Sequence, residues 1–386
     1  MVAADPVIAI ARVALILAGF MFVYLGVKGT LEPLIMIPMG FGMSSVNAGV
    51  LYLSATTTGT LFIDPTISDT THLLEVLQID FLQPLYTFTF SNGLIACLIF
   101  MGIGTLSDIG YLLISPGRCM IIAICAELGT LLTFPIAVAM GFPFNEAAAI
   151  AMVGSADAPM VLYTSLLLAK DLFVPITIVA YLYLSLAYAG YPYLVRFMIP
   201  KAIRGLKMDP SKIPNISKAE KVTFAVITST LLCLLFPVAA PLFMSFFLGV
   251  VVRESGVKQF VEFLSGPVLY GSTFFLGILL GVLFEAGTIL DPKVILLLIL
   301  GITALLLSGI GGLLGGLLVY RFGGRNFNPT IGISGVSCIP TTAKVAQKEA
   351  RGANKHAVIL PWAMGASVSG VISSAIIAGI YVTLLR

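Results

Sequence analysis

The chain has 386 residues, of which 59% are hydrophobic and only 10% are charged. Soluble domains carry about 25% charged residues, so a water-soluble fold of this composition would lack the polar side chains to cover its surface. The formal net charge of +3 is small, and no basic patch is interleaved with aromatic residues, so we expect no nucleic-acid partner.

Three charge-free runs, at 222–252, 294–320 and 357–385, are each long enough to cross about 30 Å of hydrocarbon. Only helices and closed barrels satisfy the backbone in lipid. A barrel would show short alternating segments, whereas these runs are continuous. The sequence therefore predicts an all-α polytopic membrane protein. A cleavable signal peptide is not expected, because the first apolar run is long and contains Arg12.

In the first half, we expect spans near 7–27, 84–106, 119–141 and 173–199, a broken apolar stretch at 34–53, and a polar, acidic segment at 54–82. The apolar stretch 146–169 is interrupted by Gly154 and Pro159. The most basic loop, 200–222, is cytoplasmic by the positive-inside rule. If the acidic segment lies outside, an odd number of crossings is required, which favours a re-entrant hairpin at 146–169.

The second half has the same plan: spans at 223–252, 266–285, 293–320 and 357–385, with a broken stretch at 328–348. Residues 100–103 resemble 275–278, and both broken stretches contain Gly-x4-Pro, at Gly154–Pro159 and Gly335–Pro340. Paired broken segments in two halves point to a transport site between them. The alternative is that Gly and Pro are simply common in membrane helices. The predicted organisation is 1–82, a first repeat at 83–200, the basic loop 201–222, and a second repeat at 223–386.

Asp157 is the sharpest candidate, because it is an acid inside an apolar, broken segment. A carboxylate at membrane depth costs about 2.5–3.5 kcal/mol or more, so it needs a partner or a function. Together with carbonyl and hydroxyl oxygens it suits a hard cation such as Na⁺. The alternative is a helix N-cap. Ser337 in the second broken segment is placed to supply a hydroxyl, although serines also bond helices to one another in lipid.

Other residues allow more than one interpretation. Tyr181 and Tyr183 are spaced so that only one can face the hairpin; either ion contact or plain packing fits them. Glu127 either pairs with a cation, is protonated, or lies at the membrane interface. Lys344, in a basic cluster, is either a cytoplasmic-loop charge or a binding site for an anion. With two histidines and no CxxC pair, the sequence predicts Na⁺ alone and no transition metal.

Several stretches resemble the β subunits of the sodium-transporting carboxybiotin decarboxylases, which act on oxaloacetate, methylmalonyl-CoA and glutaconyl-CoA. They occur in the family's order over nearly the whole chain, at 31–44, 100–111, 153–164, 180–183, 253–257, 328–341, 363–365 and 369–372. The resemblance implies two inverted repeats with re-entrant broken-helix hairpins and an elevator-like movement. It also implies a homo-oligomer in the cell membrane.

The resemblance further implies a function: the subunit decarboxylates carboxybiotin on a carrier protein, consumes a proton and exports Na⁺. The biotin would be carried by a partner, because this chain has no biotinylation motif. Expected partners are a biotin carrier protein, a carboxyltransferase subunit and a small membrane subunit. By family position, the catalytic residues are Asp157, Tyr181, Tyr183 and Lys344, and the Na⁺-binding residues are Asp157, Asn328, Gly332, Ser337 and Ser367.

Four residues depart from the family pattern: Ser155 and Ala158 stand where glycines are usual, Lys344 replaces an arginine, and Ser367 replaces an asparagine. Lysine cannot grip a carboxylate in the two-pronged way that arginine does. Two rival interpretations remain from sequence: a sodium-coupled transporter of a small carboxylate without decarboxylase activity, and a passive channel or structural subunit. The donor acid cannot be read from this chain, because the partner subunit would select it.

Overall fold

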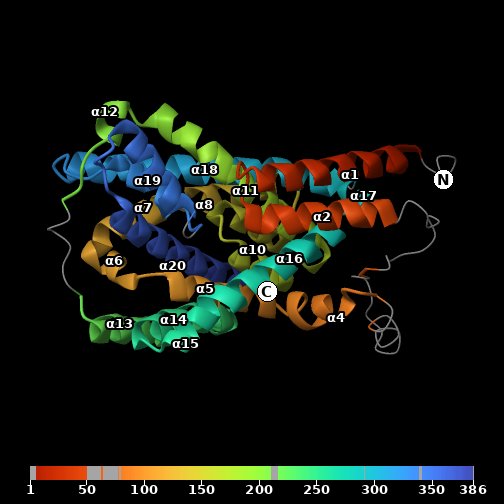
Figure 1. Ribbon diagram of the computed structural model, residues 1–386, viewed down its shortest axis with the longest axis horizontal. Coiled ribbons are helices and arrows are strands. Elements are labelled where there is room, and N and C mark those ends of the chain that lie inside the picture. Colours follow the sequence, from red (N-terminus) through yellow and green to blue (C-terminus); the bar gives the residue numbers. More distant parts are fainter. Residues whose placement is uncertain are drawn as a thin grey trace.

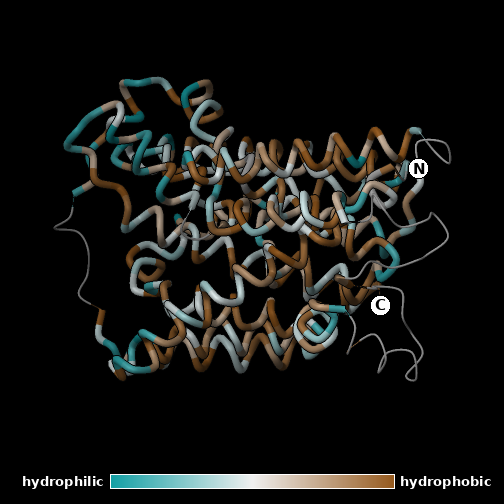
Figure 2. Tube along the Cα trace, turned by 45° about the vertical axis from the view of Figure 1, so that its right-hand side comes forward, coloured by the Kyte–Doolittle hydropathy of each residue, from teal (hydrophilic) through white to brown (hydrophobic). Residues whose placement is uncertain are grey.

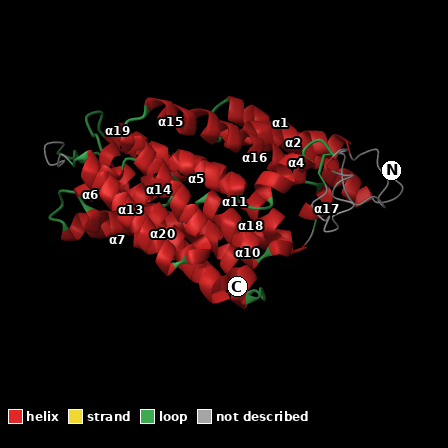
Figure 3. Ribbon diagram, turned by 90° about the horizontal axis from the view of Figure 1, so that it is seen from below, coloured by secondary structure: helices red, strands yellow, loops and turns green. Residues whose placement is uncertain are grey.

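The computed structural model describes residues 6–49, 62–63, 77, 80–209, 216–290, 292–338 and 341–385, without the side chains at 185–186 and 288–289. Most of the acidic segment 54–82, and Pro340, lie outside the described residues. The described part contains helices and loops and no strand (Figure 3). The prediction of an all-α fold is confirmed.

Six described helices are long and apolar enough to cross a membrane by themselves. They run along the long axis of the molecule (Figure 1). Their bounds are α1 Pro6–Val27, α7 with α8 Pro116–Ala139, Pro237–Ser255 including α14, Lys258–Leu283 including α15 and α16, α18 Pro292–Phe322, and α20 Leu360–Leu385. The expected spans at 7–27, 119–141, 266–285, 293–320 and 357–385 are confirmed, with shifted bounds. The span expected at 173–199 is α11, Phe173–Met198, which bends by 53° between 184 and 187.

The stretch expected to be broken at 34–53 is a helix, α2, from Pro33 to Gly49, and it continues through Pro38. Its glycines serve close packing instead. A Cβ at Gly40 would lie 2.6 Å from the carbonyl oxygen of Gly19 in α1, so a larger residue would push the two helices apart. Small residues let membrane helices approach closely without breaking them.

The span expected at 84–106 is two pieces, α4 with η2 (Gln83–Phe90) and α5 (Leu94–Leu106), which meet at 64°. Gly93 has φ +76°, a left-handed conformation that ends the first piece. The Asn92 side chain accepts a hydrogen bond from the N–H of Leu94 and so starts the second piece. The segment expected as a span at 84–106 is therefore bent at its middle.

The expected span 223–252 is also two helices, α13 (Lys218–Leu235) and α14 (Ala240–Ser255), separated at Phe236 and the short turn η6, Pro237–Ala239. Lys221 in the first turn of α13 lies 3.5 Å from Glu254 in the last turn of α14, so the two helices are antiparallel neighbours. A proline cannot donate a helical hydrogen bond, which is why the chain turns back there.

Both segments expected to be broken near 146–169 and 328–348 are broken. The first is α9 (Phe144–Ala151), η3 (Met152–Ser155) and α10 (Ala158–Leu168). The second is η8 (Pro329–Gly335) and α19 (Thr341–Ala353). Both pack against α18 and α20, so the two breaks share the same neighbours.

The polar residues gather toward the ends of the bundle and the apolar residues along its length (Figure 2). The short helix α12, Lys201–Arg204, lies at the end of the molecule that also holds the start of α13 (Figure 1). This end carries the described basic residues of the loop 200–222, and the positive-inside rule predicts that it is cytoplasmic. Helix α1 begins toward the opposite end (Figure 1).

Candidate functional site

The two helix breaks are joined by hydrogen bonds. The backbone N–H of Ser337 donates to the carbonyl oxygen of Ser155 at 3.2 Å, and the Ser337 hydroxyl donates to the same oxygen at 2.7 Å. The Ser337 hydroxyl also lies 3.3 Å from that of Ser374 in α20. Residues 182 positions apart thus meet at one point, which we call the crossing.

Asp157 lies at the crossing, at the start of α10. Its side chain is buried, with 4% of the residue exposed, and its Oδ2 atom has no hydrogen-bond partner. Its backbone N–H donates to the Ser155 hydroxyl at 3.3 Å. An unpaired buried carboxylate oxygen is costly, so it marks a place where a ligand or a proton is needed.

Ala156, between Ser155 and Asp157, has φ +55°, which is unusual for a residue with a side chain. This left-handed conformation costs about 1–2 kcal/mol for a non-glycine residue. Such strain persists only where the surroundings enforce it, and it is frequent at functional sites. Here the strained turn directs the next residue, Asp157, into the crossing.

The sequence left the position of Glu127 open, and the structure places it inside the protein. It lies at the junction between α7 (Pro116–Ala126) and α8 (Leu128–Ala139), and only 3% of it is exposed. Its two carboxylate oxygens accept hydrogen bonds from Thr130 at 2.8 Å and Ser373 at 3.3 Å. The turn after Glu127 packs against the turn before Asp157, where Gly154 lies against Gly129 and Thr130. The interfacial reading of Glu127 was wrong.

The turn after Glu127 and the turn before Asp157 pack closely because glycines lie where they meet. A Cβ at Gly154 would lie 2.7 Å from the backbone nitrogen of Thr130 and 2.8 Å from the carbonyl carbon of Gly129. The hydroxyl of Ser308 in α18 donates to the carbonyl oxygen of Gly154 and fixes the same turn from the other side. The backbone of the first break is therefore clamped between α8 and α18.

Tyr181 and Tyr183 of α11 have different surroundings. Tyr181 is 3% exposed, its hydroxyl has no partner, and it lies within electrostatic reach of Asp157. Tyr183 instead donates its hydroxyl hydrogen to the carbonyl oxygen of Leu298 in α18 at 2.7 Å. The structure thus brings Tyr181 to Asp157 and uses Tyr183 to join α11 to α18.

Asn328 and Gly332 are packed into the start of the second break. The Asn328 amide donates to the carbonyl oxygens of Arg204 and Leu206, both at 2.8 Å, and its oxygen accepts from the N–H of Thr330 at 2.9 Å. Gly332 lies directly against Gly312 and Gly316 of α18. These contacts hold η8 against the basic loop and α18.

Ser367 belongs to the other side of the second break. It is fully buried in α20, and its hydroxyl lies 3.4 Å from that of Thr342 in the first turn of α19. Thr342 in turn approaches the carbonyl oxygens of Val336 and Cys338 at 3.0 and 3.1 Å. The hydroxyls of Ser367 and Thr342 and these two carbonyl oxygens thus lie together at the second break.

Lys344 is exposed on α19, on the wall of a pocket of about 500 Å³. It is not part of the crossing, and it forms no ion pair within the described part of the chain. The structure therefore separates the sequence-predicted residues into a buried group around Asp157 and a surface group around Lys344.

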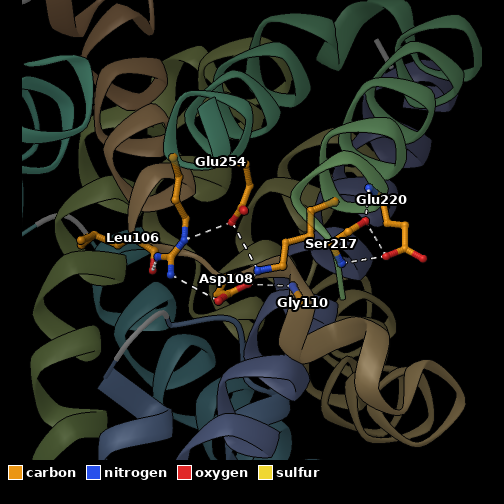
Figure 4. A network of polar contacts seen from close by, with 8 residues as sticks. Leu106, Asp108, Gly110, Ser217, Glu220 and Glu254 are labelled. Atoms are coloured by element: carbon orange, nitrogen blue, oxygen red, sulfur yellow. Dashed lines mark hydrogen bonds and ion pairs between the residues drawn. The ribbon is translucent and has the colours of Figure 1, made fainter. Parts of the chain in front are cut away.

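The family-like stretches 100–111 and 253–257 meet in an ion-pair network (Figure 4). Asp108 caps α6 (Ile109–Ile114) and binds Lys221 at 2.8 Å and Arg253 at 3.3 Å. Burial opposes the charged form of Asp108. The hydrogen bonds from Lys221 and Gly110, with the charges of Arg253 and Lys221, outweigh burial and hold the pKa of Asp108 below its usual value. Asp108 is therefore a structural residue that joins α6, α13 and α14.

The fold and the crossing define a class: a polytopic helical membrane protein with an unpaired carboxylate where two broken helices meet. The sequence model of the Na⁺-transporting oxaloacetate decarboxylase beta subunit matches residues 11–385. The chain belongs to this family.

Three relatives illustrate its range. The carboxybiotin decarboxylase of Malonomonas rubra is 56% identical over 99% of this chain and 95% of its own length. The methylmalonyl-CoA decarboxylase subunit beta of Propionigenium modestum is 31% identical, over 96% of this chain and 94% of its own. The probable oxaloacetate decarboxylase beta chain of Vibrio cholerae is 30% identical, over 95% and 94%.

The predicted family is confirmed, and with it the prediction of a multi-pass membrane subunit of a biotin-dependent, Na⁺-transporting decarboxylase. The family implies Na⁺ and a biotin that arrives as carboxybiotin, together with other decarboxylase subunits. The alternative of a carboxylate transporter without decarboxylase activity finds no support among these relatives.

Proposed function

We propose that the chain decarboxylates carboxybiotin on a carrier protein and exports Na⁺ through a site built on the crossing. The observation that carries this proposal is the buried, unpaired Oδ2 of Asp157, beside the hydrogen-bonded breaks at Ser155 and Ser337. A carboxylate, hydroxyls and carbonyl oxygens are the ligands that a hard cation prefers.

The proposed Na⁺ site combines residues at the crossing with residues of η8. Asp157 and Ser337 contribute the carboxylate and a hydroxyl at the crossing, and Ser367 adds a hydroxyl from α20. Asn328 and Gly332 complete the set from η8, where their contacts hold the backbone of the second break in place. Glu127 adds a second negative charge close to Asp157, which favours a bound cation.

The proton consumed in the reaction has candidate donors on this chain. Loss of CO₂ from carboxybiotin breaks the N–C bond and leaves a nitrogen anion, which takes up one proton to give biotin. Tyr181 and Asp157 are the proposed proton-handling groups at the crossing, because both have unpaired oxygens there. A cation beside a carboxylate favours its charged form, so Na⁺ binding and proton release are coupled at Asp157. Tyr183 positions α11 through Leu298, and Lys344 binds the incoming carboxylate.

The two broken segments are proposed to be the re-entrant hairpins of two inverted repeats, at 83–200 and 223–386, with 1–82 and the loop 201–222 outside them. Their shared neighbours and their meeting at Ser155 and Ser337 support this. An elevator-like movement of the hairpins would expose the crossing to each side in turn. A cysteine at position 155 should then react with a water-soluble thiol reagent from both sides. Reaction from one side alone, with and without Na⁺, contradicts the movement.

The proposed partners are separate chains: a biotin carrier protein, a carboxyltransferase subunit, a small membrane subunit and further copies of this chain. Co-purification of the tagged chain with the other subunits tests this assembly. The expected result is a complex in which biotin is attached only to another chain. Biotin attached to this chain contradicts the proposal.

The test of function is decarboxylation of carboxylated biotin by the purified, reconstituted chain, with and without Na⁺. We expect Na⁺ to stimulate the wild-type protein, and Asp157→Asn to lose this stimulation. Asp171→Asn is the matched control, because Asp171 is an exposed acid next to the same hairpin. Full Na⁺-dependent activity in Asp157→Asn contradicts the proposed site, and no decarboxylation in the wild type contradicts the proposed activity.

A further inference from the structure

A pocket of about 500 Å³ opens between three separate parts of the chain. Its walls come from the turn after α1, from α11 and from α19. The lining residues are Gly29, Thr30, Tyr188, Ala189, Pro192, Tyr193, Arg196, Lys344, Val345 and Lys348. Its volume lies within the range of about 300–1,000 Å³ that is typical of small-molecule sites.

Every charged residue that lines this pocket is a cation: Arg196, Lys344 and Lys348. Arg196 is already paired, because its Nε and Nη2 atoms each donate to a carboxylate oxygen of Glu349 at 2.8 Å. Glu349 is 3% exposed, so this two-pronged contact fixes α19 against α11. It leaves the two lysines as the charges that face the pocket.

Lys344 and Lys348 are one helical turn apart on α19, and neither forms an ion pair within the described ranges. Like charges at this spacing repel each other. With no acid paired to them among the described residues, both lysines are available to a ligand. An anion between the two lysines would relieve their repulsion.

The aromatic and apolar residues of the pocket wall can pack against a flat ring. Tyr188 and Tyr193, one on each side of Pro192 on α11, present aromatic and apolar surface to the pocket. Tyr193 is 71% exposed, so the pocket has an open side. A ligand attached by a tether to another protein can therefore reach it. Cationic groups beside flat apolar walls match a carboxylate on a fused-ring system.

We propose that this pocket receives the carboxylated ring of carboxybiotin, with Lys348 as a second binding residue beside Lys344. Arg196 is a positioning residue, because it acts through Glu349 to hold α19 in place. The inference rests on the proposed decarboxylase function and adds to it a docking step separate from the crossing. The carboxylate is held at the surface by Lys348 before it approaches Asp157.

The test compares Lys348→Gln with Lys348→Arg in the reconstituted protein, using the carboxylated carrier as substrate. We expect Lys348→Gln to raise KM about tenfold, in line with loss of one charge-assisted hydrogen bond, with little change in kcat. Lys348→Arg should keep KM close to the wild-type value. The Na⁺ concentration for half-maximal activity should stay unchanged in both, because the crossing is intact.

Lys355→Gln is the matched control, since Lys355 is exposed near the end of α19 but does not line the pocket. It should leave KM unchanged. If Lys348→Gln has the wild-type KM, or if Lys355→Gln raises KM equally, the pocket assignment is overturned while the decarboxylase function stands. If the wild-type protein shows no decarboxylation, the proposed function itself has failed.

Discussion

Gly154→Ala tests how the two broken segments are held together. A Cβ at this position would lie 2.7 Å from the nitrogen of Thr130 and 2.8 Å from the carbonyl carbon of Gly129. Both are backbone atoms, so no side chain can move aside to make room. Overpacking of this kind costs about 1–3 kcal/mol.

The matched control is Gly190→Ala in α11, where no atom lies within 4 Å of an added Cβ. Alanine in a helix is about 1 kcal/mol more favourable than glycine, so this variant should be slightly stabilised. We therefore expect the two variants to differ by about 2–4 kcal/mol in stability.

The assay is the midpoint of thermal unfolding of the purified protein in detergent, together with the Na⁺ concentration for half-maximal decarboxylation. Gly154→Ala should unfold at a lower temperature than the wild type and need more Na⁺, because displacement of the turn moves Asp157. Gly190→Ala should match or exceed the wild type in both. If Gly154→Ala unfolds at the same temperature as Gly190→Ala, the clamp on the first break does not exist.

Three further predictions concern single side chains. Ser337→Ala removes a hydrogen bond at the crossing worth about 1 kcal/mol and should raise the Na⁺ concentration for half-maximal activity. The control Ser245→Ala removes a buried hydroxyl in α14 and should leave this concentration unchanged. Equal effects of the two substitutions contradict a role of Ser337 in Na⁺ binding. Glu127→Gln keeps the shape of the side chain but removes its negative charge. The affinity for Na⁺ should therefore fall, while the melting temperature changes little. Unchanged Na⁺ binding would refute a role of Glu127 in the site. The lowered pKa of Asp108 stabilises the fold above its unfolded pKa of about 3.9, and this contribution is lost as pH falls through the folded pKa. The melting-temperature gap between wild type and Asp108→Asn should thus be largest near neutral pH and shrink in acid; a constant gap argues against this.

The sequence was sufficient for the fold class and for singling out Asp157 as an acid within an apolar, broken segment. Runs such as 294–320 have no charge, and lipid leaves a long apolar run no alternative to a helix. Asp157 was recognisable because a lone acid within apolar sequence is expensive wherever it is buried. The paired Gly-x4-Pro segments indicated the two breaks, because these residues weaken helices locally and need no distant partner to do so.

Other features depended on which segments pack together. Gly40 and Gly42 of α2 resemble helix breakers in the sequence, yet in the structure they admit α1 and α16, respectively, at close range. Tyr181 and Tyr183 are equivalent by residue type, and only the position of α18 decides that Tyr183 bonds Leu298 while Tyr181 faces Asp157. The turn at Pro237 also became clear only once α13 and α14 were seen as antiparallel neighbours.

The sequence by itself thus determined what each segment is, because solvent and backbone hydrogen bonding act on every residue locally. Only the tertiary structure determined which segments contact one another. The Ser155–Ser337 bond, the packing of Gly154 against Gly129 and Thr130, and the pocket between the turn after α1, α11 and α19 each join segments from distant parts of the chain. Such contacts depend on the packing of whole helices, and no local pattern of residues encodes that packing.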